Sequence, residues 1–64
     1  MDYNEEQINR ILNYLKDKKE HSTSDISVNC VINQYKVLVL LRYLEKENKV
    51  ARKTINKVNK WSIL

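Results

Sequence analysis

Residues 33–50 constrain the fold most, because most of them are expected to form one amphipathic helix whose apolar face must be buried. Asn33 is a strong helix N-cap, since its side-chain oxygen can accept a backbone N–H of the first turn. Apolar residues then recur at the i, i+3, i+4, i+7 spacing of one helical stripe: Val37, Leu40, Leu41 and Leu44. Asn48 can adopt the left-handed conformation that ends a helix. The pattern predicts a helix over about residues 34–47 that packs its stripe into a core.

The opposite face of this helix is apolar, aromatic and basic at once. Four residues are expected to point away from the core stripe: Tyr35, Leu38, Val39 and Tyr43. They stand beside Lys36, Arg42 and Lys46. A helix buried on every side is hard to accommodate in so short a chain, because small domains bury a limited share of their surface. We therefore expect this face to contact a partner.

The chain lacks the cysteine pairs and metal ligands that usually stabilise small folds. Its 64 residues make one domain, 1–64, near the lower limit for folding without a disulfide or a metal. Cys30 is the single cysteine and is expected to be a small core hydrophobe. His21 is the single histidine and is expected in an exposed loop, without a catalytic or zinc-binding role. With no nucleophile–base pair, paired carboxylates or glycine loop, we expect no enzyme activity and no cofactor.

The sequence also predicts a cytoplasmic protein without membrane contact. No apolar run approaches the roughly 20 residues of a membrane span, and no signal peptide precedes the acidic start. The lone cysteine gives no indication of an oxidising compartment.

Positive charge is concentrated near the C-terminus. The chain has 12 Lys and Arg residues against 8 Asp and Glu, a formal net charge of +4. Residues 49–64 contain no acidic side chain and five basic ones: Lys49, Arg52, Lys53, Lys57 and Lys60. This clustering is typical of a protein that binds a polyanion.

Two shorter helices are expected before residue 33. Asn4 begins the first, which carries one apolar stripe composed of Ile8, Ile11, Leu12 and Leu15. Residues 21–25 are expected as a loop into the second, with Ser22 or Thr23 as its cap. Its apolar edge is expected to be Ile26 and Cys30, with Val31 and Ile32 filling the turn that follows.

Residues 50–63 alternate in the manner of a β-hairpin. The turn is expected at residues 55–58, where Asn56 suits a positive φ. Val50, Trp61 and Ile63 are expected to face inward. Three helices followed by a charged hairpin predict a winged helix-turn-helix, mainly α with a small hairpin as its wing.

The sequence resembles the PapI/FaeA-like family of fimbrial operon regulators. The residues that carry the resemblance are Thr23, Ile26, Cys30 (where the family has Leu), Tyr35, Leu41, the run Leu44-Glu45-Lys46, Val50, Arg52 and Trp61. It extends over nearly the whole chain. The resemblance implies a cytoplasmic bacterial DNA-binding co-regulator that acts beside the leucine-responsive regulatory protein, a global regulator, at sites containing GATC. Such proteins control phase-variable adhesin expression.

The leading hypothesis is a small sequence-specific transcriptional regulator that binds double-stranded DNA. Its third helix would enter the major groove, where the residues expected to reach base edges or flanking phosphates are Gln34, Tyr35, Lys36, Val39 and Arg42. The wing would hold phosphates through Arg52, Lys53, Lys57 and Lys60.

One alternative stays open, and a second is disfavoured by the sequence. In the first, the chain is a protein-interaction or dimerisation module with weak or no DNA binding, in which Leu38 and Tyr43 contact a partner. Its oligomeric state would then be a monomer or a weak homodimer. In the second it resembles the winged helices that bind Z-form nucleic acid, with the same helix order and final Trp. Those proteins read with an Asn and a Tyr on the third helix, where this chain has Leu38 and Arg42.

Overall fold

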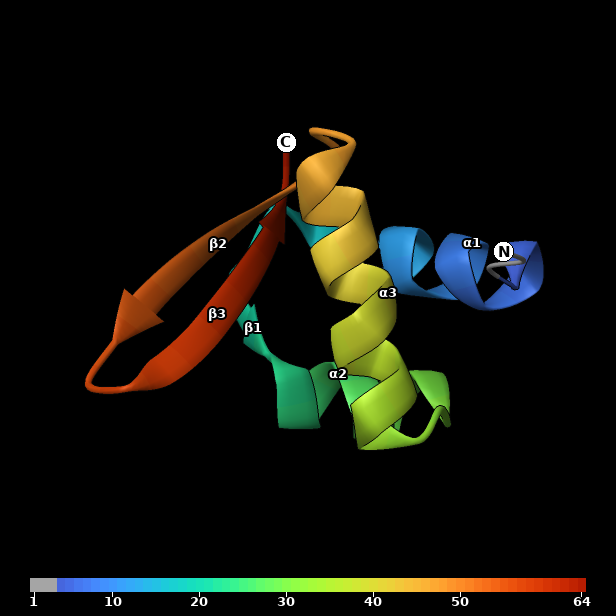
Figure 1. Cartoon of the computed structure of the whole chain (residues 1–64), viewed down its shortest axis with the longest axis horizontal. Helices are drawn as coiled ribbons and strands as arrows, with labels where there is room; N and C mark the ends of the chain where they lie inside the picture. The colour runs from blue at the N-terminus through green and yellow to red at the C-terminus, as the bar shows by residue number, and fades with distance from the viewer. Residues whose placement is uncertain (1–3) are drawn as a thin grey trace.

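The computed structural model describes residues 4–64 as three helices beside a three-stranded antiparallel sheet (Figure 1). The first three residues of the predicted domain, 1–64, lie outside this description. The elements in chain order are α1 (Glu5–Tyr14), the short 3-10 helix η1 (Leu15–Asp17), β1 (His21–Ser22), α2 (Thr23–Cys30), α3 (Gln34–Lys46), β2 (Val50–Ile55) and β3 (Val58–Ile63). This is the order of a winged helix-turn-helix, so the predicted fold is confirmed.

Each of the three α-helices begins at a side-chain cap. The Asn4 Oδ1 atom accepts the Gln7 N–H at 3.1 Å before α1. The Asn33 Oδ1 atom accepts the Tyr35 N–H at 2.8 Å before α3. Ser22, rather than Thr23, caps α2, because its Oγ accepts the Asp25 N–H at 3.1 Å. Caps of this kind satisfy backbone N–H groups that have no partner inside the helix.

The chain contains no glycine, so its left-handed turns use residues with a Cβ atom. Within residues 4–64 the positive-φ positions are Lys18, Val31, Asn48, Asn56 and Lys57. Asn48 and Asn56 were predicted and are confirmed. Val31 ends α2 with φ 56° and its side chain is 83% exposed, so the expectation that it fills the turn is wrong. The left-handed conformation directs its side chain away from the apolar edge of α2, and Ile32 alone is buried there.

One hydrophobic core joins the helices to the sheet. Its buried members are Ile11, Leu15, Ile26, Cys30, Ile32, Val37, Leu40, Leu41, Leu44, Val50 and Trp61. All four residues of the predicted α3 stripe are among them. The burial of Cys30, Val50 and Trp61 was also predicted, and Ile63 packs partly buried against the same cluster. None of the helices in residues 4–64 has both the length and the apolarity needed to cross a lipid bilayer.

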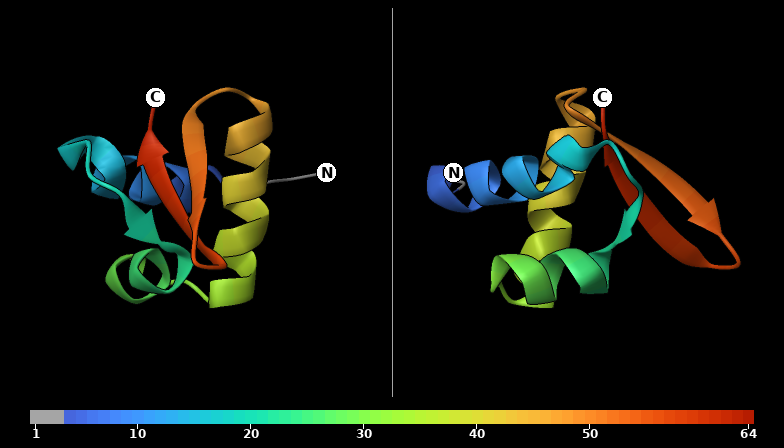
Figure 2. Two further views of the ribbon diagram at one scale, coloured as in Figure 1. Left: turned by 90° about the vertical axis from the view of Figure 1, so that its left-hand side faces the viewer. Right: turned by 180° about the vertical axis from the view of Figure 1, so that it is seen from behind.

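The sheet has the order β1-β3-β2, with β2 beside α3 (Figure 2, left). Residues 21–25 were predicted as a loop, and this is wrong, because His21–Ser22 is a strand that pairs with β3 and residues 23–25 form the first turn of α2. A two-residue strand has no periodicity to detect, since its existence depends on the neighbour it pairs with.

The strand register divides the wing into two sides. His21, Trp61 and Arg52 lie in one row across the three strands, and Ser22, Lys60 and Lys53 form the next row. Successive strand residues point to opposite faces of a sheet. Because Trp61 is buried in the core, its row is on the helix side of the sheet. The row with Lys53 and Lys60 is on the outer side.

Candidate nucleic-acid interface

The open face of α3 lies opposite its core stripe. At the α-helical period of about 100° per residue, the residues farthest from the stripe are Tyr35, Val39, Arg42 and Lys46. The Tyr35 side chain is 78% exposed, Arg42 and Lys46 are exposed, and Val39 is half-buried. The predicted residues Tyr35, Val39 and Arg42 thus share one surface. Gln34, at the exposed start of α3, and the half-buried Lys36 border it.

Leu38 and Tyr43 do not belong to this open face. Both are half-buried and pack against the hydrophobic core, so the expectation that they point away from it is wrong. They flank the stripe on opposite sides, where the neighbouring elements of the fold still cover a helix surface. Because they are on opposite flanks, they do not form one patch. Their role in binding a partner stays a prediction.

Arg52 is positioned next to α3 by two contacts. Its Nε atom is 3.3 Å from the Glu45 Oε2 atom of α3, and its guanidinium is 5.9 Å from the centre of the Trp61 ring. Both contacts follow from the row that Arg52 shares with Trp61 on the helix side. The ion pair is partly exposed, and such pairs contribute little to stability, so an incoming phosphate could replace Glu45.

The structure does not bring the four predicted wing cations together. Lys53 and Lys60 are directly opposite each other on the outer side of the sheet. Arg52 is on the helix side, and Lys57 is in the hairpin turn. A duplex lying against α3 therefore faces Arg52 and Lys57, but not Lys53 and Lys60.

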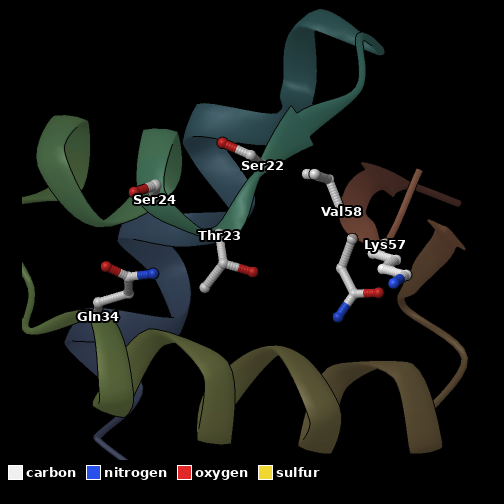
Figure 3. Close-up of a pocket in the computed structure, with 7 residues that line it drawn as sticks. Ser22, Thr23, Ser24, Gln34, Lys57 and Val58 are labelled. Carbon is white, nitrogen blue, oxygen red and sulfur yellow. The ribbon is translucent and has the colours of Figure 1, made fainter. Parts of the chain in front are cut away.

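A cleft of about 240 Å³ separates the tip of the wing from the start of α2 and α3 (Figure 3). Its lining residues are Ser22, Thr23, Ser24, Gln34, Lys57, Val58 and Asn59. The cleft places Gln34 of α3 and Lys57 of the wing around one opening. Hydroxyl, amide and ammonium groups of this kind are the usual protein donors to phosphate oxygens.

The hydroxyl residues of this cleft were not predicted as part of a site. The sequence indicated Ser22 and Thr23 as helix caps, and Thr23 also as one of the residues that carry the family resemblance. In the structure the Thr23 Oγ1 atom accepts the Trp61 Nε1–H at 2.9 Å, which joins α2 to β3. This contact spans 38 positions in the chain, so no local sequence pattern could indicate it.

His21 is not an exposed loop residue, and that expectation is wrong. Its side chain is 13% exposed and lies between two carboxylates. The Nδ1 atom is 2.7 Å from Asp25 Oδ2, and the Nε2 atom is 2.8 Å from Asp17 Oδ2. The Tyr14 hydroxyl donates to the same Asp25 oxygen at 2.9 Å. In the sequence, only the i±4 spacing of Asp17, His21 and Asp25 could have indicated this cluster. The spacing brings the three side chains together only because η1, β1 and α2 have the conformations seen in the structure.

The carboxylates favour the charged imidazolium. Burial opposes the charge, but the hydrogen bonds to Asp25 and Asp17 raise the pKa of His21 above its ordinary value. The hydrogen bond from His21, followed by that from Tyr14, lowers the pKa of Asp25. The Lys19 backbone N–H and then His21 lower the pKa of Asp17. Since each ring nitrogen is held by a carboxylate, this cluster joins η1, β1 and α2 rather than activating a hydroxyl.

Comparison with known proteins identifies the family of this fold. The model of the FaeA-like protein family matches residues 7–63. The chain belongs to the FaeA-like family. This confirms the family resemblance noted in the sequence. No curated protein matches the chain.

Solved structures similar to this FaeA-like chain are winged-helix domains. The Zα domain of PKZ from Carassius auratus, solved in complex with Z-DNA, has a TM-score of 0.83 at 15% identity, covering 94% of this chain and 95% of that one. The structure of HOP2, described by its DNA recognition and protein interaction domains, has a TM-score of 0.82 at 24% identity, covering 91% of this chain and 98% of that one. BpsR of Bordetella bronchiseptica, whose DNA binding is regulated by 6-hydroxynicotinic acid, has a TM-score of 0.83 at 16% identity, covering 91% of this chain and 46% of that one. These likenesses establish the fold.

Proposed function

We propose that this protein is a sequence-specific transcriptional regulator that binds duplex DNA with the open face of α3 and the helix side of the wing. One observation carries the proposal. The helix α3 has its apolar stripe in the core and an open opposite face with Tyr35 and Arg42, while Arg52 and Lys57 come from the wing next to it. A groove-binding helix flanked by cations has the shape and charge that DNA requires.

The chemistry of α3 suits the major groove. Gln34 can pair with adenine, Arg42 with guanine, and Val39 can contact a thymine methyl group. Lys36, Arg52 and Lys57 would hold phosphates, which position the helix without reading sequence. We leave Lys53 and Lys60 out of this contact because they lie on the outer side of the sheet.

The family supports a more specific role. FaeA-like membership favours action in the cytoplasm on fimbrial or adhesin operons, beside a global regulator of the leucine-responsive type. The similar structures support nucleic-acid binding by this fold, since one is solved in complex with Z-DNA and the DNA binding of another is regulated by 6-hydroxynicotinic acid. The same membership favours a regulator over an enzyme.

A salt-titrated mobility-shift assay tests the proposal. The probes are an AT-rich fimbrial promoter fragment, with and without the leucine-responsive regulator, and a random duplex of equal length. Arg42→Ala should weaken binding to the promoter by about 1–3 kcal/mol and weaken random binding less, whereas Lys36→Ala should weaken binding to both probes about equally, because it removes a phosphate contact. The affinity of the parent should fall steeply with salt, because each phosphate contact releases counterions.

Lys16→Ala is the matched control, since Lys16 is an exposed lysine of η1, outside the proposed surface. If Lys36→Ala and Arg42→Ala behave like this control on both probes, α3 does not read DNA. Promoter binding that is insensitive to salt would instead support the protein-interaction alternative.

A further inference from the structure

The outer side of the wing carries a second surface, which we call the outer wing surface. It consists of two cross-strand pairs, Lys53 with Lys60 and Ile55 with Val58. The pairs are two residues apart along each strand, so all four side chains share one face of the sheet. The Ile55 and Val58 residues are 41% and 45% exposed, and neither belongs to the hydrophobic core.

The positive charge of this surface is weakly compensated. Like charges directly opposite each other on a sheet repel. The Lys53 Nζ atom is 3.8 Å from the Glu20 Oε2 atom, but both side chains are largely exposed, so the pair contributes little. The charge of the half-buried Lys60 helps to lower the pKa of Asp25, but that carboxylate already accepts hydrogen bonds in the His21 cluster. Two lysines therefore remain available to an acidic partner.

We propose that the outer wing surface binds an extended acidic–apolar segment of a partner protein. The two lysines require carboxylates or phosphates, while Ile55 and Val58 gain from contact with apolar side chains. The phosphate backbone of a nucleic acid would pair with the two lysines but offers no apolar group to Ile55 and Val58. The spacing also fits, because same-face residues of an extended strand repeat every 7 Å or so, the separation of the two pairs on the wing. A segment with an acidic residue at one position and an apolar residue two positions later would match both pairs.

The surface is distinct from the proposed DNA site. Arg52 and Trp61 occupy the helix side, and the sheet itself separates them from Lys53 and Lys60. A duplex bound to α3 would leave Lys53, Ile55 and Lys60 open, whereas Val58 also lines the cleft beside Lys57. The inference therefore does not depend on the DNA-binding proposal.

An NMR titration of the isotope-labelled chain tests the inference. The probe is a synthetic peptide that repeats Glu-Ser-Leu-Ser, in which every second residue alternates between acidic and apolar. We expect the amide signals of Lys53, Ile55, Val58 and Lys60 to shift while those of the open face of α3 do not. Two further peptides, Gln-Ser-Leu-Ser and Glu-Ser-Ser-Ser repeats, should bind clearly more weakly, because each lacks one half of the pattern.

Variants identify the side chains responsible. Lys53→Gln combined with Lys60→Gln should weaken peptide binding by about tenfold, the sum of two modest ion pairs. Lys18→Gln combined with Lys19→Gln removes the same charge from another exposed segment and should leave binding unchanged. Ile55→Thr keeps a strand-forming residue and should also weaken binding, which provides a second measurement should the double variant be unstable.

Three results would overturn the inference. The first is a peptide that shifts the α3 signals instead, or shifts none. The second is equal binding of the three peptides. The third is a short duplex that shifts Lys53 and Lys60 and displaces the peptide, which would assign the outer wing surface to DNA.

Discussion

His21 connects three segments of the chain through one side chain. Its ring nitrogens contact Asp17 of η1 and Asp25 of α2, while its backbone belongs to β1. The ring also lies 4.6 Å from that of Tyr14, centre to centre. A single imidazole therefore helps to fix the segment between α1 and α2, together with the buried Leu15 of η1 and the pairing of β1 with β3.

This connection predicts a pH-dependent stability. The pKa of His21 is raised above 6.5 by its carboxylate partners. The resulting stability is complete below pH 6.5 and is lost as the pH rises through the higher folded value. The pKa values of Asp17 and Asp25 are lowered from 3.8, so their contribution is complete above pH 3.8 and is lost as the pH falls through the lower folded values.

Thermal melts followed by circular dichroism should show Tm decreasing from about pH 5.5 to 8.5, the range where histidine titrates. The upper end of this pH range is chosen so that Cys30 and Tyr14 do not titrate within it. Their pKa values are raised from 9.0 and 10.0, respectively. His21→Gln should remove most of this slope. A parent Tm that is constant over the range, or a slope that the variant retains, would show that His21 is not its source.

Trp61 has the largest side chain among the fully buried residues and gives the second residue-level prediction. Trp61→Ala should remove about 3–5 kcal/mol of stability, which is about all that so small a domain has. Thr23→Val keeps the shape of Thr23 but leaves the Trp61 N–H without its acceptor, so we expect a smaller loss of about 1–3 kcal/mol. The measurement is urea denaturation. An unfolding midpoint unchanged in both variants would contradict the packing of β3 on α2.

Among the elements, α3 shows what a local pattern can predict. Its cap, its apolar stripe and the left-handed Asn48 that follows its end at Lys46 depend on local spacing and residue type, and all three features were predicted. The limits of its buried face were not, because Leu38 and Tyr43 are covered by elements that are distant in sequence. The strand β1 was missed for the same reason, since only its pairing with β3 makes it a strand.

The hairpin turn gives a prediction at the level of an element. Asn56 and Lys57 both have positive φ, at 50° and 66°, the arrangement of a type I′ turn, which favours Asn-Gly. A left-handed lysine costs about 1–2 kcal/mol in local strain. Lys57→Gly should therefore raise stability by about 0.5–1 kcal/mol, after the greater chain entropy of glycine in the unfolded state is subtracted.

The same substitution should weaken DNA binding slightly, with a salt slope lower by about one unit, because one phosphate contact is lost. Thermal melts and mobility-shift titrations of the variant measure the two effects. Lys57→Ala is the control, since it removes the charge without relieving the strain. If Lys57→Gly melts at or below the parent temperature, the turn is not strained.

For the whole molecule, the order of the elements was predictable but the distribution of charge over the wing was not. Arg52 and Lys53 are neighbours in sequence, and alternation places them on opposite sides of the sheet. Which side faces α3 depends on the pairing of Arg52 with Trp61, and hence on the position of the turn. The cleft of Figure 3 likewise needs three elements to meet, so the sequence could indicate the DNA-binding class but not the shape of the site.

Likeness of fold does not establish a shared specificity, and this gives the prediction at the largest scale. We expect the chain not to convert an alternating CG duplex to the Z form. Leu38, where the Z-form readers have an Asn, is half-buried and has no side-chain hydrogen bond to offer. Circular dichroism of the duplex at rising protein concentration measures the conversion. A Z-form spectrum at any concentration would support the alternative function.

Trp61 gives the molecule a built-in optical probe. It is the only tryptophan in the sequence, its side chain is fully buried, and its indole N–H is bonded to Thr23 while Arg52 lies over the ring. Its fluorescence therefore reports on a single place, where the wing meets α2 and the arginine proposed to hold phosphate. Unfolding would shift the emission to the red as water reaches the indole. A ligand that draws Arg52 away would change the intensity of a still-folded protein, so folding and binding can be followed in one cuvette without a label.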